Sequence, residues 1–365
     1  MTIRTGVETA VSDEGLFIPL IDFSHFLHGT AEEKQACAKA IVSGFRDAGF
    51  IYLKNHGIPE ETVKDLFQKS AEFFKRSQCQ KESLAWYSAR ANRGYSTFGR
   101  EKTTRLTSKL DVDTLREKSP DLKESFEIGR SDDPEYPNLW PDKFDDAGAK
   151  FKMNMEAFFQ TGDKMHIQLM QAIAMGLGIQ EDWFDKYCKT ADNTLRLLHY
   201  PGARKEVLGT GDDDEAAQGG NEKKTKAVRA GAHTDYGTIT LLFQDNAGGL
   251  QVRSPSGAYV DATPIPGTIV VNAGDLLARW SNDQIKSTEH RVVKPPSHPV
   301  VVHGEDGQTE EWYPARYSCV YFCNPDFTSF IEAIPGTYGG DKGERKYPGV
   351  KCEDYMVDRL QSTYA

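Results

Sequence analysis

The stretch that decides the fold of this 365-residue chain is residues 228–243, VRAGAHTDYGTITLLF. From Thr238 to Phe243 the residues are largely β-branched or aromatic and alternate, which predicts a strand. Side chains two residues apart in an extended chain point to the same side. We therefore expect His233 and Asp235 to offer an imidazole nitrogen and a carboxylate oxygen to one point in space.

Two such groups are too few for a catalytic metal site, and a third lies further along the chain. Residues 286–293, KSTEHRVV, form another strand-like run that contains His290. Two histidines and one carboxylate make the facial triad of mononuclear non-haem Fe(II) oxygenases, which leaves coordination positions open for a co-substrate and O₂. On these three residues alone, the alternative that each histidine is an ordinary core or surface residue stays open.

A third strand-like run, residues 313–322 (YPARYSCVYF), supplies a matching anion site. Arg316 and Ser318 share one face of this strand. A guanidinium binds a carboxylate with two parallel hydrogen bonds, and a serine hydroxyl can donate another. His-x-Asp, a distant His and then Arg-x-Ser, in this order, indicate an iron centre beside a site for a dicarboxylic acid.

This order of motifs resembles the Fe(II)/2-oxoglutarate-dependent dioxygenases with the isopenicillin-N-synthase-like fold. Residues 45–58 (FRDAGFIYLKNHGI) resemble the N-terminal signature of the family, and residues 272–277 (NAGDLL) resemble its turn between the second and third metal ligands. The resemblance covers nearly the whole chain. It implies a mostly β fold with flanking helices, in which a double-stranded β-helix (jelly roll) is buttressed by an N-terminal helical region.

The same resemblance implies three regions in the chain. Residues 1–190 would form an N-terminal helical and mixed region that packs on the barrel. Residues 191–335 would form the catalytic β-helix core, and residues 336–365 a C-terminal helical tail. Helical periodicity predicts a helix from a Thr30–Glu33 capping box to about residue 48, a second over 59–74, and a long third over 147–177 ending at Gly178.

The cofactors also follow from the resemblance. His233, Asp235 and His290 would bind Fe(II), and 2-oxoglutarate and O₂ would be consumed, with ascorbate as a stimulant. Arg316, Ser318 and Tyr200 would hold the far carboxylate of 2-oxoglutarate. The family has an Asn-x-Tyr-Pro run where this chain has residues 198–201, LHYP, so Leu198 replaces the asparagine and leaves its contact to the co-substrate in doubt.

Within the family, residues 195–201, 233–245, 273–293 and 321–325 resemble the fungal thymine dioxygenases. This resemblance implies that Tyr236 and Phe322 sandwich a planar base and that Arg196 donates hydrogen bonds to it. Strict alternation from Asp235 would instead turn Tyr236 away from the metal unless Gly237 lets the backbone twist. Packing of Phe322 in the core and a structural salt bridge of Arg196 are the plainer alternatives.

Asn272 and Trp280 are two further candidates for the pocket wall. The implied reaction is the sequential oxidation of the thymine 5-methyl group. The alternative is a fungal 2-oxoglutarate oxygenase that acts on another aromatic or heterocyclic compound in secondary metabolism or nicotinate-type catabolism. A zinc hydrolase would leave Arg316 and Ser318 without a purpose, and a non-catalytic barrel would be expected to have lost metal ligands. Residues 202–228 and 304–311 are polar insertions that could act as lids.

The composition limits the kinds of binding partner that we expect for this chain. The chain carries 44 basic and 54 acidic residues, a net charge of −10, and no long basic stripe, which argues against a nucleic-acid groove. None of its six cysteines forms a Cys-x-x-Cys pair, which fits a reducing compartment. No secretory signal is visible, and no apolar run approaches the roughly 20 residues that span a bilayer. We expect a cytoplasmic enzyme that binds a small aromatic or pyrimidine molecule, with no nucleic-acid or membrane partner.

Overall fold

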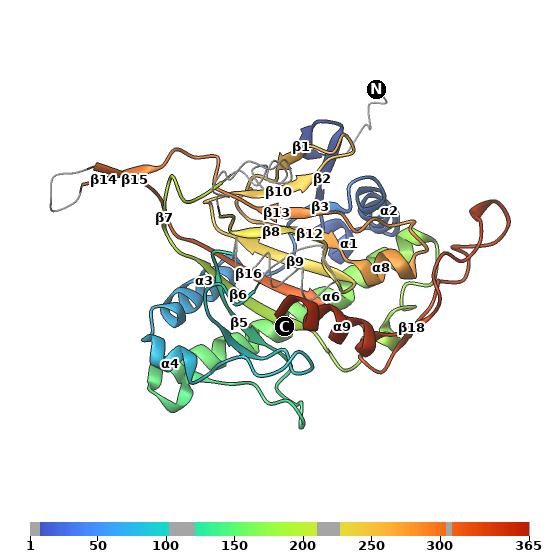
Figure 1. Cartoon of the computed structure of the whole chain (residues 1–365). Helices are drawn as coiled ribbons and strands as arrows, with labels where there is room; N and C mark the ends of the chain where they lie inside the picture. The colour runs from blue at the N-terminus through green and yellow to red at the C-terminus, as the bar shows by residue number, and fades with distance from the viewer. Residues whose placement is uncertain (1–7, 102–120, 210–226, 304–308, 365) are drawn as a thin grey trace.

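A nine-stranded sheet forms the centre of the computed structural model, which describes residues 8–101, 121–209, 227–303 and 309–364 (Figure 1). The strand order is β1-β2-β3-β12-β9-β16-β6-β5-β4, and every neighbouring pair is antiparallel except β2 and β3. The strands are β1 (Glu8–Asp13), β2 (Leu16–Asp22), β3 (Phe50–Lys54), β4 (Gly94–Ser96), β5 (Glu124–Ile128), β6 (Thr194–Tyr200), β9 (Ile239–Gln244), β12 (Thr268–Ala273) and β16 (Arg316–Cys323).

A four-stranded sheet in the order β11-β10-β13-β8 packs against part of the large sheet. Its strands are β8 (Ala230–His233), β10 (Leu250–Arg253), β11 (Tyr259–Asp261) and β13 (His290–Val292). In its register His233 lies directly opposite His290. Two small sheets complete the β-structure: β7 (Ala203–Arg204), β14 (Val300–His303) and β15 (Thr309–Tyr313) form an arm that extends from the body in Figure 1, and β17 (Phe330–Ile331) pairs with β18 (Val350–Lys351).

The large sheet separates two apolar cores, and strand β16 shows how the sequence assigns side chains to them. Cys319, Tyr321 and Cys323 point to the core shared with the helices, whereas Val320 and Phe322 belong to the core between the two sheets. Strand β6 alternates in the same way. Because side chains in a strand alternate between faces, the polar residues at even positions of β16 also face the space between the sheets.

Helices pack around the large sheet, and α2, α3 and α6 cover its other face. The helices are α1 (Ser24–His28), α2 (Ala31–Asp47), α3 (Glu60–Phe74), α4 (Gln78–Glu82), α6 (Asp146–Leu177), α8 (Asp275–Trp280) and α9 (Cys352–Tyr364), with short 3₁₀ turns η1 (Pro141–Lys143), η2 (Asp185–Tyr187) and η4 (Gly340–Lys342). The Thr30–Glu33 capping box at the start of α2 is confirmed. So is the end of α6 at Gly178, whose φ of 80° is accessible to glycine at low cost.

The fold is therefore mixed α/β with N-terminal helices, and the N-terminal half also contributes strands β1 to β5 to the central sheet. Most of each predicted insertion, residues 210–226 and 304–308, lies outside the described residues, so the prediction that these insertions act as lids has no structural counterpart here. Within the described ranges, none of the helices combines the length and the apolar character that crossing a bilayer requires.

Candidate active site

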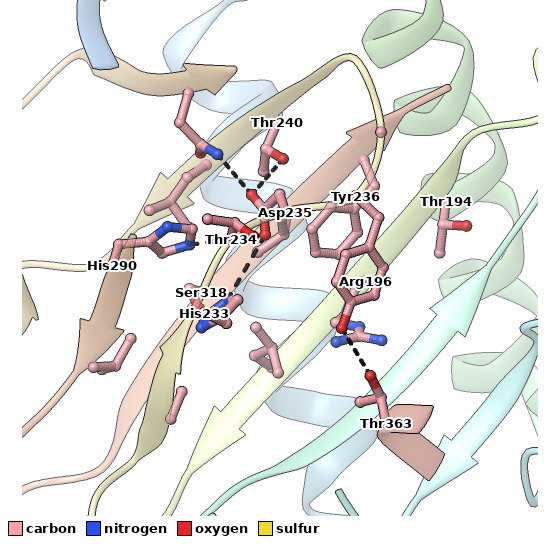
Figure 2. Close-up of a pocket in the computed structure, with 18 of the residues that line it drawn as sticks. Thr194, Arg196, His233, Thr234, Asp235, Tyr236, Thr240, His290, Ser318 and Thr363 are labelled. Carbon is pink, nitrogen blue, oxygen red and sulfur yellow. Dashed lines mark hydrogen bonds and ion pairs between the residues drawn. The ribbon is translucent and has the colours of Figure 1, made fainter. Parts of the chain in front are cut away.

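A pocket lies between the two sheets and is closed on one side by α9. Figure 2 shows it from within, with His233, Asp235 and His290 pointing toward one another on one side and Arg196 and Tyr236 on the other. Strands β6, β9, β12 and β16 of the large sheet and β8, β10 and β13 of the small sheet all contribute to its wall.

The three predicted metal ligands meet at one point of this pocket. Oδ1 of Asp235 lies 3.7 Å from Nε2 of His233 and 3.8 Å from Nε2 of His290. One ligand atom from each of the three residues falls within 4.8 Å of the others. Two imidazole nitrogens and one carboxylate oxygen on one side of a small space fit a divalent iron ion and leave its opposite side open.

Hydrogen bonds orient each of the three groups. Nδ1 of His233 donates to the carbonyl of Gly231 at 2.8 Å, and Nδ1 of His290 donates to the carbonyl of Thr288 at 3.2 Å. A carbonyl oxygen can only accept, so the proton sits on Nδ1 and Nε2 keeps the lone pair that a metal needs. Both Nε2 atoms are therefore prepared for coordination before an ion binds.

Hydrogen bonds to Oδ2 fix the orientation of the Asp235 carboxylate. Its Oδ2 accepts hydrogen bonds from Oγ1 of Thr240 at 2.6 Å and from Nδ2 of Asn272 at 2.7 Å, which leaves Oδ1 for the ion. Burial works against its ionisation, but His290, His233 and these two donors outweigh burial and lower the pKa of Asp235. Burial, together with the neighbouring His290, lowers the pKa of His233. A carboxylate beside neutral imidazoles is the protonation state in which these residues bind a metal.

The backbone between His233 and Thr238 explains how Tyr236 reaches the pocket. Strand β8 ends at His233, and residues 234–238 follow without strand pairing, so the alternation that would turn Tyr236 away does not apply. Gly237 lets this segment lie against the end of β16, because a Cβ there would be 2.4 Å from the carbonyl oxygen of Cys323. The ring of Tyr236 lines the pocket, and its hydroxyl lies 2.8 Å from that of Thr363 in α9.

The predicted anion site lines the same pocket from strand β16 of the large sheet, whereas His233 and His290 come from the small sheet. Arg316 is 1 % exposed, and its guanidinium donates to the carbonyl of Gly248, to Oγ of Ser318 and to Oε1 of Gln244 at 3.0, 3.2 and 3.4 Å. Its Cζ lies 5.0 Å from the centre of the Tyr200 ring. Leu198, the residue that replaces the family asparagine, is apolar and lies in the core between the sheets, where it also lines the pocket.

The three predicted substrate residues, Arg196, Tyr236 and Phe322, also line the pocket. Cζ of Arg196 lies 5.3 Å from the centre of the Phe322 ring. Its Nε is 2.9 Å from Oε1 of Glu127, and its Nη1 is 3.5 Å from Oε2 of Glu101. Arg196 therefore takes part in buried salt bridges and faces the pocket at the same time, so the two interpretations of this residue are compatible.

The two further candidates for the pocket wall have different outcomes. Asn272 lines the pocket and holds Asp235, as described above. The prediction for Trp280 is wrong. This residue ends helix α8 and is 1 % exposed, and its ring packs edge-on against Trp183, Phe184 and Tyr187 in a cluster of aromatic side chains outside the pocket.

Other parts of the pocket wall have no signal in the sequence. Lys123 and Glu101 form a buried ion pair with Nζ and Oε2 3.0 Å apart, and both line the pocket. Met356, Leu360 and Thr363 of α9 close it from the side opposite the small sheet. These residues carry no recognisable motif, and their contribution depends on tertiary contacts. The apolar spacing of α9 alone would have predicted only a helix that packs on the body.

Comparisons with known proteins agree with this geometry. Residues 18–143 match the family described as non-haem dioxygenase in morphine synthesis N-terminal, and residues 191–325 match the 2OG-Fe(II) oxygenase superfamily. A fungal relative, the 2-oxoglutarate-Fe(II) type oxidoreductase ppzD of Metarhizium rileyi, is 32 % identical over 94 % of this chain and 90 % of its own length. The chain belongs to the 2OG-Fe(II) oxygenase superfamily and is a 2-oxoglutarate-dependent dioxygenase that uses Fe(II).

Among solved structures, the likeness to one particular fungal enzyme is much stronger. The full-length thymine 7-hydroxylase of Neurospora crassa in complex with alpha-KG and thymine is 51 % identical, with a TM-score of 0.83, over 98 % of this chain and 100 % of the other. The same enzyme with alpha-KG and 5-formyluracil has a TM-score of 0.80 at 48 % identity. A putative 2OG-Fe(II) oxygenase family protein from Caulobacter crescentus is 25 % identical, with a TM-score of 0.72.

Proposed function

We propose that this enzyme oxidises the 5-methyl group of thymine in successive steps, with 2-oxoglutarate as co-substrate. The observation that carries the proposal is a pocket in which an iron triad, two aromatic rings and an arginine meet, in a chain 51 % identical to a Neurospora crassa hydroxylase that binds thymine. The complex of the Neurospora crassa enzyme with 5-formyluracil supports successive oxidation, because this aldehyde is a partly oxidised form of the same methyl group.

In this proposal, His233, Asp235 and His290 hold Fe(II), while Arg316, Ser318 and Tyr200 hold the far carboxylate of 2-oxoglutarate. Bound iron with 2-oxoglutarate and O₂ supplies the oxidising power that replaces a C–H bond by C–OH, with succinate and CO₂ as the other products. The protein contributes position and a dry environment. Ser318 accepts from Arg316, so its own hydroxyl proton is free to reach the carboxylate.

Tyr236, Phe322 and Arg196 would select the substrate. Two aromatic rings favour a flat ring between them. A guanidinium suits the carbonyl oxygens of a pyrimidine, and the salt bridges of Arg196 to Glu127 and Glu101 limit the orientations of its donors. The aromatic pair would set the plane of the base and the arginine its rotation in that plane, so that one substituent points at the metal.

We further infer that the large and small sheets form the double-stranded β-helix, or jelly roll, of this superfamily. Support comes from the apolar core shared by the two sheets and from the triad, which lies where β8 ends and β13 begins. A metal at the open end of such a barrel is reachable by substrate, while the distal carboxylate site lies deeper on β16.

A second candidate is the oxidation of another small ring compound. Fungal relatives at about one third identity carry other descriptions, such as the proline hydroxylase buaE of Petromyces alliaceus at 32 % identity. The names of these relatives therefore indicate that substrate choice differs within this superfamily. The pocket of this chain, with its aromatic pair, favours a planar substrate over proline.

The test is a turnover assay with purified enzyme, Fe(II), 2-oxoglutarate and ascorbate. Thymine should be converted to its alcohol, aldehyde and acid, with one succinate released per oxidation, and Asp235→Ala should abolish the oxidised pyrimidines and the succinate. Uracil, which lacks the methyl group, is the matched control. Succinate release with another aromatic compound but none with thymine would overturn the substrate assignment, and no succinate with any compound would overturn the reaction.

A further inference from the structure

A second arginine, Arg229, lies beside the anion site and is fully buried, with 0 % exposure. It directly precedes β8. Its Cζ is 5.9 Å from the centre of the Tyr200 ring, and that of Arg316 is 5.0 Å from the same ring. Burial and the neighbouring Arg316 lower the pKa of Arg229 to about 10, so its guanidinium stays charged at neutral pH. Two buried guanidinium groups thus lie beside the same tyrosine ring.

In the described part of the chain no carboxylate forms an ion pair with either arginine, and Asp245 favours the charged form of Arg229 only from a longer distance. Arg229 donates one hydrogen bond, from Nη2 to the carbonyl of Pro314 at 2.6 Å. Its Nε and Nη1 are buried, and within the described ranges they have no acceptor. The acceptors of Arg316 are uncharged oxygens of Gly248, Ser318 and Gln244. Among the described residues neither arginine has a carboxylate within ion-pair distance.

Gln244 carries a third buried donor without a partner among the described residues. Gln244 is the cross-strand partner of Ser318 in the pairing of β9 with β16, and it shares the strand face of Thr240 and Leu242, which line the pocket. Its Oε1 accepts from Arg316, while its Nε2 is buried and has no acceptor in the part of the chain that the structure describes. Buried donors without partners are rare in folded proteins and call for an explanation, such as a bound water or ligand.

We propose that Arg229 is a second positioning residue of the co-substrate site, which selects 2-oxo acids with a carboxylate at both ends. The inference rests on the proposed function, in which Arg316 and Ser318 bind the distal carboxylate. A single guanidinium balances one negative charge of 2-oxoglutarate. A second guanidinium beside it makes the site strongly unfavourable for a 2-oxo acid whose far end is a methyl group, because two buried guanidinium groups would then have no carboxylate in direct contact.

Anaerobic calorimetric titration of the Fe(II)-loaded protein tests this proposal with a matched pair of ligands. 2-Oxopentanoate has the chain length of 2-oxoglutarate and a methyl group in place of the far carboxylate. Arg229→Met should weaken 2-oxoglutarate binding about tenfold or more and leave 2-oxopentanoate binding unchanged or tighter. Arg229→Lys, which keeps the charge and loses the planar fork, should fall between Arg229→Met and the unaltered protein.

A control separates this role from a purely structural one. Arg76→Met removes a guanidinium that is paired with Asp145 outside the pocket. Arg76→Met should lower the melting temperature equally with and without 2-oxoglutarate. Arg229→Met should instead reduce the difference between the melting temperatures measured with and without 2-oxoglutarate. If Arg229→Met does not fold, the ratio of the two affinities in Arg229→Lys and Arg229→Gln decides.

Two negative results are distinguishable. If the unaltered protein binds 2-oxoglutarate and the Arg229 variants keep the same affinity ratio and the same difference between the melting temperatures, the role of Arg229 is overturned and the proposed function stands. If the unaltered, iron-loaded protein does not bind 2-oxoglutarate, the proposed function is overturned together with the role of Arg229.

Discussion

The hydroxyl of Tyr236 and the hydroxyl of Thr363 lie 2.8 Å apart, which joins the segment that carries Asp235 to helix α9. Arg359 of the same helix places its Cζ 4.6 Å from the centre of the Tyr236 ring. The ring that would cover one face of the substrate is thus held by a helix far away in sequence. Substrate affinity should therefore depend on α9, although this helix supplies no metal ligand.

Replacing either hydroxyl tests this link. We expect Thr363→Val and Tyr236→Phe each to raise KM for the aromatic substrate about two- to tenfold, the worth of one hydrogen bond, with KM for 2-oxoglutarate unchanged. Because both variants remove the same bond, the double variant should be no worse than the single ones. Additive effects in a steady-state assay would contradict a direct interaction between the two hydroxyls.

Asn272 is expected to set the affinity for iron without touching the ion. Its amide donates to the Asp235 oxygen that does not face the metal, so Asn272→Ala should weaken Fe(II) binding about 10- to 100-fold. Asn193→Ala is a matched control, because Asn193 is also buried and donates to a carboxylate, that of Asp163, at 3.0 Å. The control should lose stability and keep its iron affinity. Equal iron affinities in the two variants, measured by competition with a chelator, would rule out this role.

Arg196 and its salt bridges should act on substrate binding alone. Arg196→Met removes the donors that face the pocket and should raise KM for thymine about tenfold or more. Glu127→Gln keeps the shape of the buried partner but removes its charge, so the arginine is held less firmly and KM should rise less. The titration of 2-oxoglutarate should be unchanged in both. A change in 2-oxoglutarate affinity would mean that the two halves of the pocket are not independent.

His166 should make the protein less stable in acid. Burial lowers its pKa to about 3, far below the value of about 6.5 for an exposed histidine. Between these two pKa values, His166 binds a proton in the unfolded chain and stays neutral in the folded chain. The free energy of unfolding should therefore fall as pH decreases from about 6.5 toward 3, by about 1.4 kcal/mol per pH unit from this residue.

The measurement is a series of urea unfolding curves across this pH range for the unaltered protein and for His166→Phe. The variant should show a pH slope that is smaller by the amount given above, whatever its stability at neutral pH. If the free energies of unfolding of the two proteins change in parallel from pH 6.5 to 3, His166 does not contribute to the loss of stability in acid.

Strand periodicity explains why much of the site was predictable. Arg316, Ser318 and Phe322 are separated by even numbers of residues on a regular strand, as are Arg196 and Tyr200. Each group therefore lies on one face of its strand, and the sequence alone predicts this. Local pattern fails where the strand ends. Alternation would have turned Tyr236 outward, but β8 stops at His233, and the tight packing of Gly237 redirects the chain.

Other features depend on tertiary packing and have no local signature. Trp280 ends a short helix, and its direction is set by an aromatic cluster with residues of the 183–187 segment. The ion pair of Lys123 with Glu101 and the contribution of α9 to the pocket arise only when separate segments meet. The unpartnered donors of Arg229 among the described residues likewise have no signal in the sequence, because they depend on which residues surround this side chain after folding.

The strand order of the central sheet has a consequence for biosynthesis. Strand β3 pairs on one side with β2 and on the other with β12. Residues 50–54 can therefore complete their pairing only after residues 268–272 have been synthesised. While a ribosome is still making the second half of the chain, one edge of β3 has no neighbour, and a bare edge invites pairing with other nascent chains. Long-range pairing of this kind is slow. We expect the growing polypeptide to need a chaperone that shields residues 50–54 until β12 emerges.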